Sequence, residues 1–176
     1  MYTLEQVKEH SDDRDYVLNA IREDGLLLEG ASEILRNDKE IVMEAVSKDG
    51  GALEFASDEL KDDKDILMKS VETKGWVICY ASERLRKDKE LILKAAIKDG
   101  QILYYASKEL RDDYDVVLAA VQNKGLILKY ASKRLRSDKS IALEAIKQDK
   151  RAFDFIVPEL RNDEEIQNII NPKTDS

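Results

Sequence analysis

One 25-residue motif recurs along the chain at least five times without an insertion, and this fixed period constrains the fold more than any other feature. An Ala-Ser pair, a leucine followed by a basic residue, and an aspartate each return at that interval. A glycine closes each unit, at Gly25, Gly50, Gly75, Gly100 and Gly125. Tandem units of one length stack so that each contacts only its neighbours. The 176 residues are therefore expected to form one elongated array of about seven units.

The first part of each unit is predicted to be an amphipathic helix, and residues 88–100 serve as the example. Apolar residues lie at Leu91, Ile92, Ala95 and Ala96, a spacing that places them on one helical face. An aspartate equivalent to Asp88 precedes the helix in each unit and can cap its free amide groups. The glycine that follows is expected to end the helix in a left-handed backbone conformation.

The second part of the unit, residues 101–111 in the same example, is also predicted to be helical, with a break. Pro158 of the last unit follows the position that is serine in the earlier units. Proline suits the first turn of a helix and not its interior, so the serine should cap a short new turn. Each unit is then a pair of antiparallel helical segments, and the chain is predicted to be an all-α solenoid of short helix pairs.

The solenoid is expected to form a single domain over residues 1–176. Residues 1–12 would form an N-terminal cap, in which Thr3 and Gln6 are spaced for a capping box. Residues 13–162 would form the regular repeats, and 163–176 the C-terminal cap and tail, where Gln167 and Asn168 replace aliphatic residues. Polar substitutions suit terminal units, because they lack one neighbour.

Charge and composition exclude several classes of protein. The net charge is −8, and only residues 63–137, with 16 basic and 11 acidic residues, are positive. An acidic chain is a poor candidate for nucleic-acid binding, although this positive middle keeps single-stranded nucleic acid as an alternative. A single cysteine, no long apolar run and no cationic N-terminal leader favour a cytoplasmic protein with no membrane contact.

Residues for catalysis or metal binding are scarce. His10 is the only histidine, and no glycine-rich phosphate-binding motif occurs. Adjacent acids such as Asp62 and Asp63 lie in connections too short for a calcium loop and are interpreted as helix caps. We therefore expect no catalytic residue, no metal and no cofactor, so the chain is not expected to be an enzyme.

Positions that vary between units are the better candidates for function. Three such positions point away from the apolar face of the second segment and form a variable stripe. Its members, unit by unit, are Leu26, Glu29, Glu33; Gly51, Glu54, Asp58; Trp76, Cys79, Glu83; Gln101, Tyr104, Lys108; and Leu126, Lys129, Lys133.

An apolar centre with charged flanks is typical of a protein-contact surface. We therefore predict that a protein or peptide partner binds at the part of the stripe formed by Trp76, Cys79, Tyr104, Lys108, Leu126, Lys129 and Lys133. The alternative is that Trp76 and Tyr104 only cover neighbouring units.

Two repeated columns flank the stripe, and each has two interpretations. The basic column consists of Arg36, Lys61, Arg86, Arg111, Arg136 and Arg161. Its side chains either bind phosphate or carboxylate groups of a ligand, or pair with nearby aspartates and with carbonyl groups at helix ends. The aromatic column consists of Phe55, Tyr80, Tyr105, Tyr130 and Phe155. Its rings either stack between units or form a platform for single-stranded bases. A further alternative is homotypic assembly, in which one array stacks end to end on another.

The phrase Tyr-Ala-Ser-Lys-Glu-Leu-Arg-Asp-Asp (105–113), followed by Val116-Val117-Leu118-Ala119-Ala120-Val121, resembles a helical repeat family catalogued only as a domain of unknown function. The resemblance covers about residues 13–166 and departs from the pattern at Gly30, where an aromatic residue is usual, and across residues 151–170. It implies a helical repeat module without known catalytic residues, of a kind found in protists and in secreted effectors of intracellular bacteria. The resemblance thus implies a scaffold, effector or adaptor, in the host cytosol if translocated.

Overall fold

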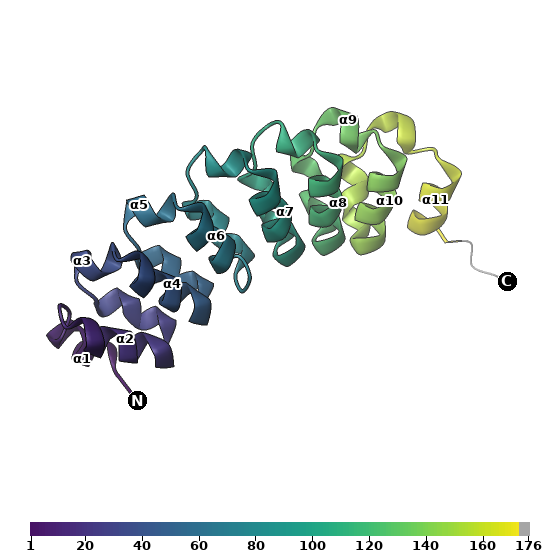
Figure 1. Cartoon of the computed structure of the whole chain (residues 1–176). Helices are drawn as coiled ribbons and strands as arrows, with labels where there is room; N and C mark the ends of the chain where they lie inside the picture. The colour runs from purple at the N-terminus through teal and green to yellow at the C-terminus, as the bar shows by residue number, and fades with distance from the viewer. Residues whose placement is uncertain (173–176) are drawn as a thin grey trace.

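A computed structural model describes residues 1–172 and confirms the all-α solenoid. No strand occurs among these residues, and the units stand side by side in one elongated, curved row from the N-terminus to the C-terminus (Figure 1). The remainder of the predicted C-terminal tail, residues 173–176, lies outside the described residues.

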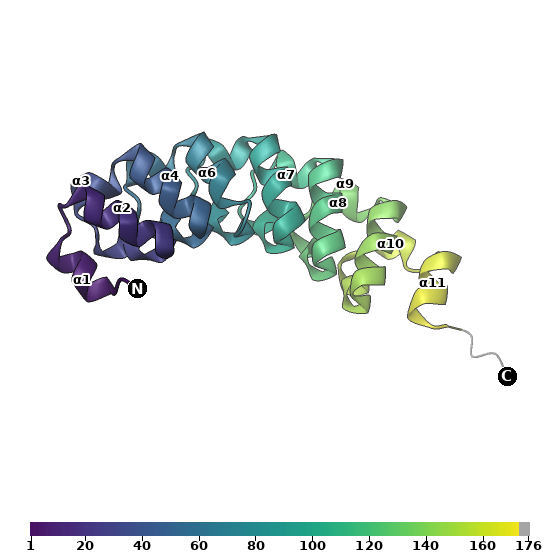
Figure 2. The same cartoon turned by 60° about the horizontal axis from the view of Figure 1, so that its bottom comes forward.

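The row has two layers of helices with the core between them. Seven α-helices follow one another along one layer (Figure 2): α2 (Arg14–Glu23), α4 (Lys39–Lys48), α6 (Lys64–Ser70), α7 (Lys89–Lys98), α8 (Tyr114–Asn123), α10 (Lys139–Gln148) and α11 (Glu164–Ile170). The second layer is a row of 3₁₀-helices: η1 (Gly25–Gly30), η2 (Gly50–Phe55), η3 (Gly75–Tyr80), η5 (Gly100–Tyr104), η7 (Gly125–Tyr130) and η8 (Lys150–Phe155). Each helix contacts its neighbours in its own layer and the layer opposite.

The second segment of each unit is a 3₁₀-helix followed by a separate short turn, so the predicted helix pair has three pieces. A six-residue 3₁₀-helix rises about 12 Å, whereas six α-helical residues rise about 9 Å. The longer form covers more of a ten-residue α-helix, which is about 15 Å long. The turns lie along the outer edge of the curve in Figure 1: α3 (Glu33–Arg36), α5 (Asp58–Lys61), η4 (Leu85–Lys87), η6 (Leu110–Asp112), α9 (Lys133–Arg136) and η9 (Pro158–Leu160).

The break and both kinds of cap are found as predicted. The Ser57 hydroxyl accepts a hydrogen bond from the Leu60 amide at 3.2 Å, and Ser132 does the same for Leu135. Pro158 occupies the first turn of η9. The predicted aspartates cap the α-helices; Asp63, for example, accepts from the amides of Asp65 and Ile66. Local polar bonds therefore set where each helix begins.

The prediction for the glycines is wrong, because no glycine in residues 1–172 has a positive φ. The helices α2, α4, α7, α8 and α10 end instead at an extended residue. One of these is Asp99, whose side chain also caps the following 3₁₀-helix. The glycine is needed for close packing. A Cβ on Gly100 would lie 2.3 Å from the carbonyl oxygen of Ala120, in the α-helix of the next unit, and a Cβ on Gly125 would lie 2.2 Å from that of Ala145.

One hydrophobic core runs the length of the array, from Val7 to Ile166. At the N-terminal end, α1 (Leu4–Glu9) has the predicted capping box between Thr3 and Gln6. This helix also explains the unusual Gly30, since a Cβ there would lie 2.9 Å from the side chain of Val7. The N-terminal cap thus occupies the space that an aromatic side chain fills in the other units.

Candidate functional site

The variable stripe lies mainly on the outer surface of the 3₁₀ row. Its first two positions in each unit belong to a 3₁₀-helix, and its third lies at the start of the short turn that follows or just before it. Trp76 is 39% exposed and Tyr104 is 52% exposed, and Lys108, Lys129 and Lys133 are also exposed. Cys79 and Leu126 are half-buried, and Gly51 is buried.

A groove of about 400 Å³ between η5 and η7 brings together three of the predicted site residues: Tyr104, Leu126 and Lys129. The other residues of its lining are Gln101, which belongs to the variable stripe, and Tyr105, Lys124, Ile127 and Tyr130, which were not among the predicted site residues. The lining thus contains two lysines and no acid. Of these residues, Tyr105 and Tyr130 were visible in the sequence as the aromatic column, but nothing in the repeat showed that the column borders a groove.

Three tyrosines form the wall of this groove. The Tyr104 ring meets Tyr105 edge-on at 5.0 Å between centroids and Tyr130 at 5.1 Å. The ammonium group of Lys129 lies 4.8 Å from the centroid of the Tyr130 ring. Rings held by one another in this way present aromatic edges and a cation without further ordering, which lowers the entropic cost of binding a ligand.

Trp76 lies apart from the groove and covers a neighbouring unit. A Cβ on Gly51 would lie 3.5 Å from the indole ring and 3.8 Å from Leu26, so the glycine sits between two large side chains. The ring also meets Tyr80 edge-on at 5.9 Å. Trp76 therefore covers part of the neighbouring unit and also leaves apolar surface exposed to a partner.

Four members of the basic column, Arg86, Arg111, Arg136 and Arg161, donate to backbone carbonyls, which is one of the interpretations that the sequence left open. Arg86 donates to the carbonyl oxygen of Cys79 at 2.9 Å, and Arg111 donates to that of Tyr104 at 2.7 Å. The same cations separate the aromatic column, because Arg86 lies 5.5 Å from the centroid of the Tyr105 ring. Within residues 1–172 no pair of column rings is in contact, so the expected ring-on-ring ladder is wrong.

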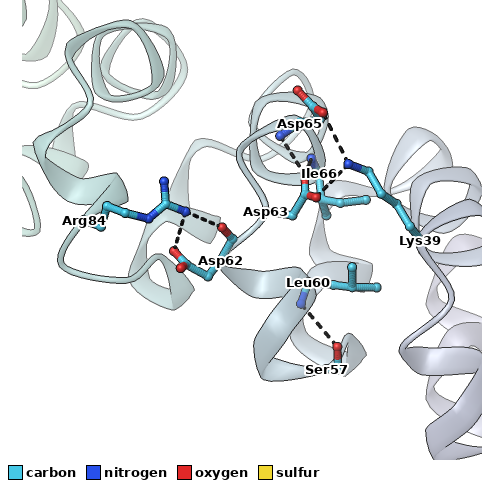
Figure 3. A network of polar contacts seen from close by, with 8 residues as sticks. All are labelled: Lys39, Ser57, Leu60, Asp62, Asp63, Asp65, Ile66 and Arg84. Carbon is cyan, nitrogen blue, oxygen red and sulfur yellow. Dashed lines mark hydrogen bonds and ion pairs between the residues drawn. The ribbon is translucent and has the colours of Figure 1, made fainter.

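Away from the stripe, a regular series of charges is paired between units. Lys39 reaches Asp63 at 2.7 Å and Asp65 at 3.3 Å in the next unit (Figure 3). The equivalent residues Arg14, Lys64, Lys89 and Lys139 each contact two acids in the same way. These pairs neutralise several cations of the positive middle, which weakens the argument for nucleic-acid binding.

Charges on the stripe are different, because most have no partner. Within residues 1–172, no ion pair includes Glu29, Glu33, Glu54, Lys108, Lys129 or Lys133. Asp58 and Glu83 pair only with lysines three and four residues away, Lys61 and Lys87. Apart from Glu83 in the third unit, the acids gather in the first two units and the lysines in the fourth and fifth.

Residues for other chemistry are not brought together. No cluster of three or more potential metal-ligating side chains of His, Cys, Asp or Glu occurs in the described part of the chain. Burial raises the pKa of the Cys79 thiol, which keeps it protonated and weakly nucleophilic at neutral pH. None of the helices within 1–172 is both long enough and apolar enough to cross a bilayer.

Comparison with known families places the chain in one of them. The family described as "Domain of unknown function (DUF4116)" matches three successive segments, residues 13–61, 63–111 and 113–161. The chain belongs to the DUF4116 family. No curated protein and no solved structure matches the chain.

Each DUF4116 segment spans two 25-residue units. One set of contacts at the junctions between segments recurs every 50 residues, which is the length of two units. Arg84 donates to the backbone carbonyl of Asp62 at 2.7 Å and lies 3.2 Å from its carboxylate (Figure 3), and the Ser82 hydroxyl also donates to that carboxylate. Arg134, Asp112 and Ser132 repeat the arrangement 50 residues later. Comparing every second unit would have revealed this pairing in the sequence.

Proposed function

We propose that this DUF4116 array is a non-catalytic scaffold that binds a protein or peptide along the variable stripe. One observation carries the proposal. Six of the eight charged side chains of the stripe form no ion pair within the described residues, whereas a regular series of charges elsewhere is paired between units. Unpaired charges beside exposed aromatic rings are free to pair with a partner, because no existing ion pair has to break first.

The groove between η5 and η7 indicates what such a partner presents there. Its lining combines Tyr104, Tyr105 and Tyr130 with the ammonium groups of Lys124 and Lys129. An extended segment with an apolar side chain next to an acidic one would fill the groove and pair with the lysines. We infer that acidic-apolar segments bind in preference to basic ones.

The test is a double substitution in the groove, Tyr104→Ala with Lys129→Glu. Tyr104 is half exposed, so its removal should change the thermal melting temperature little while partner capture falls at least about tenfold. Affinity capture from the native cells, with quantitative mass spectrometry, measures the loss. Trp76 is a poorer choice for this experiment because it also covers Gly51.

A matched control is Ile97→Ala, which truncates an apolar side chain that is 61% exposed on α7, in the other layer. This variant should retain every partner that the unaltered chain captures. Equal capture by the groove variant and the unaltered chain would refute the proposed site. A large fall in the melting temperature of the groove variant would instead show that these side chains serve the fold.

The cellular role proposed here rests on the family resemblance. As an effector or adaptor, the chain would work in the cytoplasm, which is the host cytosol if the protein is translocated. Fractionation of the cells that contain it, followed by immunoblotting, tests this location. Detection only outside cells or in a membrane fraction would contradict it.

A further inference from the structure

The variable stripe has opposite charge at its two ends. Glu29, Glu33, Glu54 and Asp58 occupy the first two units, and Lys108, Lys129 and Lys133 occupy the fourth and fifth. The third unit lies between them and carries Trp76, Cys79 and Glu83, and the carboxylate of Glu83 is paired with Lys87 at 2.8 Å. The stripe is therefore close to antisymmetric in charge about its third unit.

This antisymmetry makes the stripe complementary to itself. If a second copy lies face to face and antiparallel, a two-fold axis crosses the stripe at the third unit. The three stripe positions of a unit define three columns that run along the array. In the dimer each column faces the same column of the second copy, with the order of the units reversed. Glu29 therefore lies opposite Lys129 of the second copy, and Glu33 lies opposite Lys133. Asp58 likewise lies opposite Lys108. Every such pair occurs twice, as a two-fold interface requires.

The uncharged positions fit the same arrangement. In the first column of the stripe, Leu26 in the first unit lies opposite Leu126 of the second copy, and Trp76 lies on the axis. In the second column, Cys79 also lies on the axis, and Glu54 lies opposite Tyr104 of the second copy. In the third column, Glu83 lies opposite its own copy, with its charge already paired with Lys87 at 2.8 Å. A parallel arrangement would instead place the two acidic ends together and the two basic ends together, which repels. The charges thus select both the orientation and the register.

We propose that the variable stripe binds a second copy of the chain in this antiparallel arrangement, centred on Trp76 and Cys79. The inference rests on the proposed function in one respect, that the stripe is a protein-contact surface. It differs from end-to-end stacking, since the ends of the array stay free. A dimer of this kind covers the groove between η5 and η7 and so competes with any other partner.

The dimer should be weak and sensitive to salt. Five stacked units span roughly 40 Å, at about 10 Å for each packed helix, so the contact is long but narrow. Its ion pairs are exposed and would be screened at physiological ionic strength. Sedimentation analysis across a wide range of protein concentration should show a monomer–dimer equilibrium at low salt that shifts to monomer as NaCl is added.

Charge reversal provides the decisive test. Lys129→Glu with Lys133→Glu should raise the dissociation constant about tenfold or more, because four ion pairs become repulsive. Glu29→Lys with Glu33→Lys should do the same. Mixing the two variants should restore association as a heterodimer. A matched control reverses Glu5 and Glu9 of α1, which lie off the stripe and take part in no ion pair of the described residues.

The single cysteine tests the register independently. At mildly alkaline pH, which ionises more of the half-buried thiol, a short bis-maleimide should join two copies through Cys79, since both thiols lie near the axis. Moving the thiol to the other layer, with Cys79→Ser and Ser47→Cys, should abolish this product. Circular dichroism confirms that each variant is folded.

Three results would overturn the inference: a monomer under all conditions, a dimer that tolerates both charge reversals, or failure of the mixed variants to associate. The proposed function is judged separately, by partner capture. A monomeric chain that still captures partners through Tyr104 refutes the dimer alone. A chain that dimerises and captures no other protein refutes the heterologous partner alone.

Discussion

Gly100 shows how a single atom sets the distance between neighbouring units. Its Cα lies so close to the carbonyl of Ala120 that any side chain would overlap that oxygen. The substitution Gly100→Ala should therefore lower the free energy of unfolding by about 1–3 kcal/mol, the usual cost of overpacking. Urea denaturation followed by circular dichroism measures this loss.

Gly51→Ala is the control for that substitution. The nearest atoms to a Cβ at this position are a side-chain oxygen of Asp49 at 3.0 Å and the Trp76 ring at 3.5 Å, and both can shift. Its cost should be well below that of Gly100→Ala. An equal decrease in the free energy of unfolding for the two variants would mean that the glycines are needed for their backbone flexibility and not for the close approach of neighbouring units.

Between elements, Asp62 and Asp112 join successive DUF4116 segments. Hydrogen bonds from Ser82 and Ser132, followed by those from Arg84 and Arg134, lower the pKa of the two carboxyl groups. A pKa that is lower in the folded state stabilises the fold above the unfolded pKa, about 4 for aspartate, and this contribution disappears as pH falls through the folded pKa. The urea midpoint should therefore decrease as the pH is lowered from about 5 to about 3, a range centred on the unfolded pKa of aspartate.

The double substitution Asp62→Asn with Asp112→Asn isolates these two carboxylates. The variant should have a lower urea midpoint than the unaltered chain at neutral pH, and the difference should shrink as the pH falls below about 4. Asp58→Asn is the control, because that side chain is fully exposed and joins no two segments. A difference that stays constant with pH would show that the carboxylate charge is not what stabilises the junction.

Over the whole molecule, stability should vary with position along the array. Each inner unit packs against two neighbours and each end unit against one, so end units open at lower free energy. Hydrogen exchange measured by mass spectrometry should show the strongest protection in α7 and α8, and weaker protection toward α2 and α11. Uniform protection would instead indicate that the array unfolds in one all-or-none step.

Much of the fold could be predicted from residue spacing. The caps at Asp63 and Ser57, the turn at Pro158 and the capping box at Thr3 depend on bonds within a few residues, which a single sequence displays. The glycine role was misread because a left-handed helix end and a close approach between units require the same residue. The groove was missed because its lining comes from two units, and the repeat does not show how their side chains meet.

Periodicity by itself determined that this chain is an all-α solenoid with repeated caps, since a motif of constant length can bury its apolar face only by stacking on copies of itself. Only the tertiary structure decided that the second segment is a 3₁₀-helix, that glycine permits the close approach, and which charges remain unpaired on the stripe. Those properties depend on distances between atoms of neighbouring units, and such distances exist only once the units have packed.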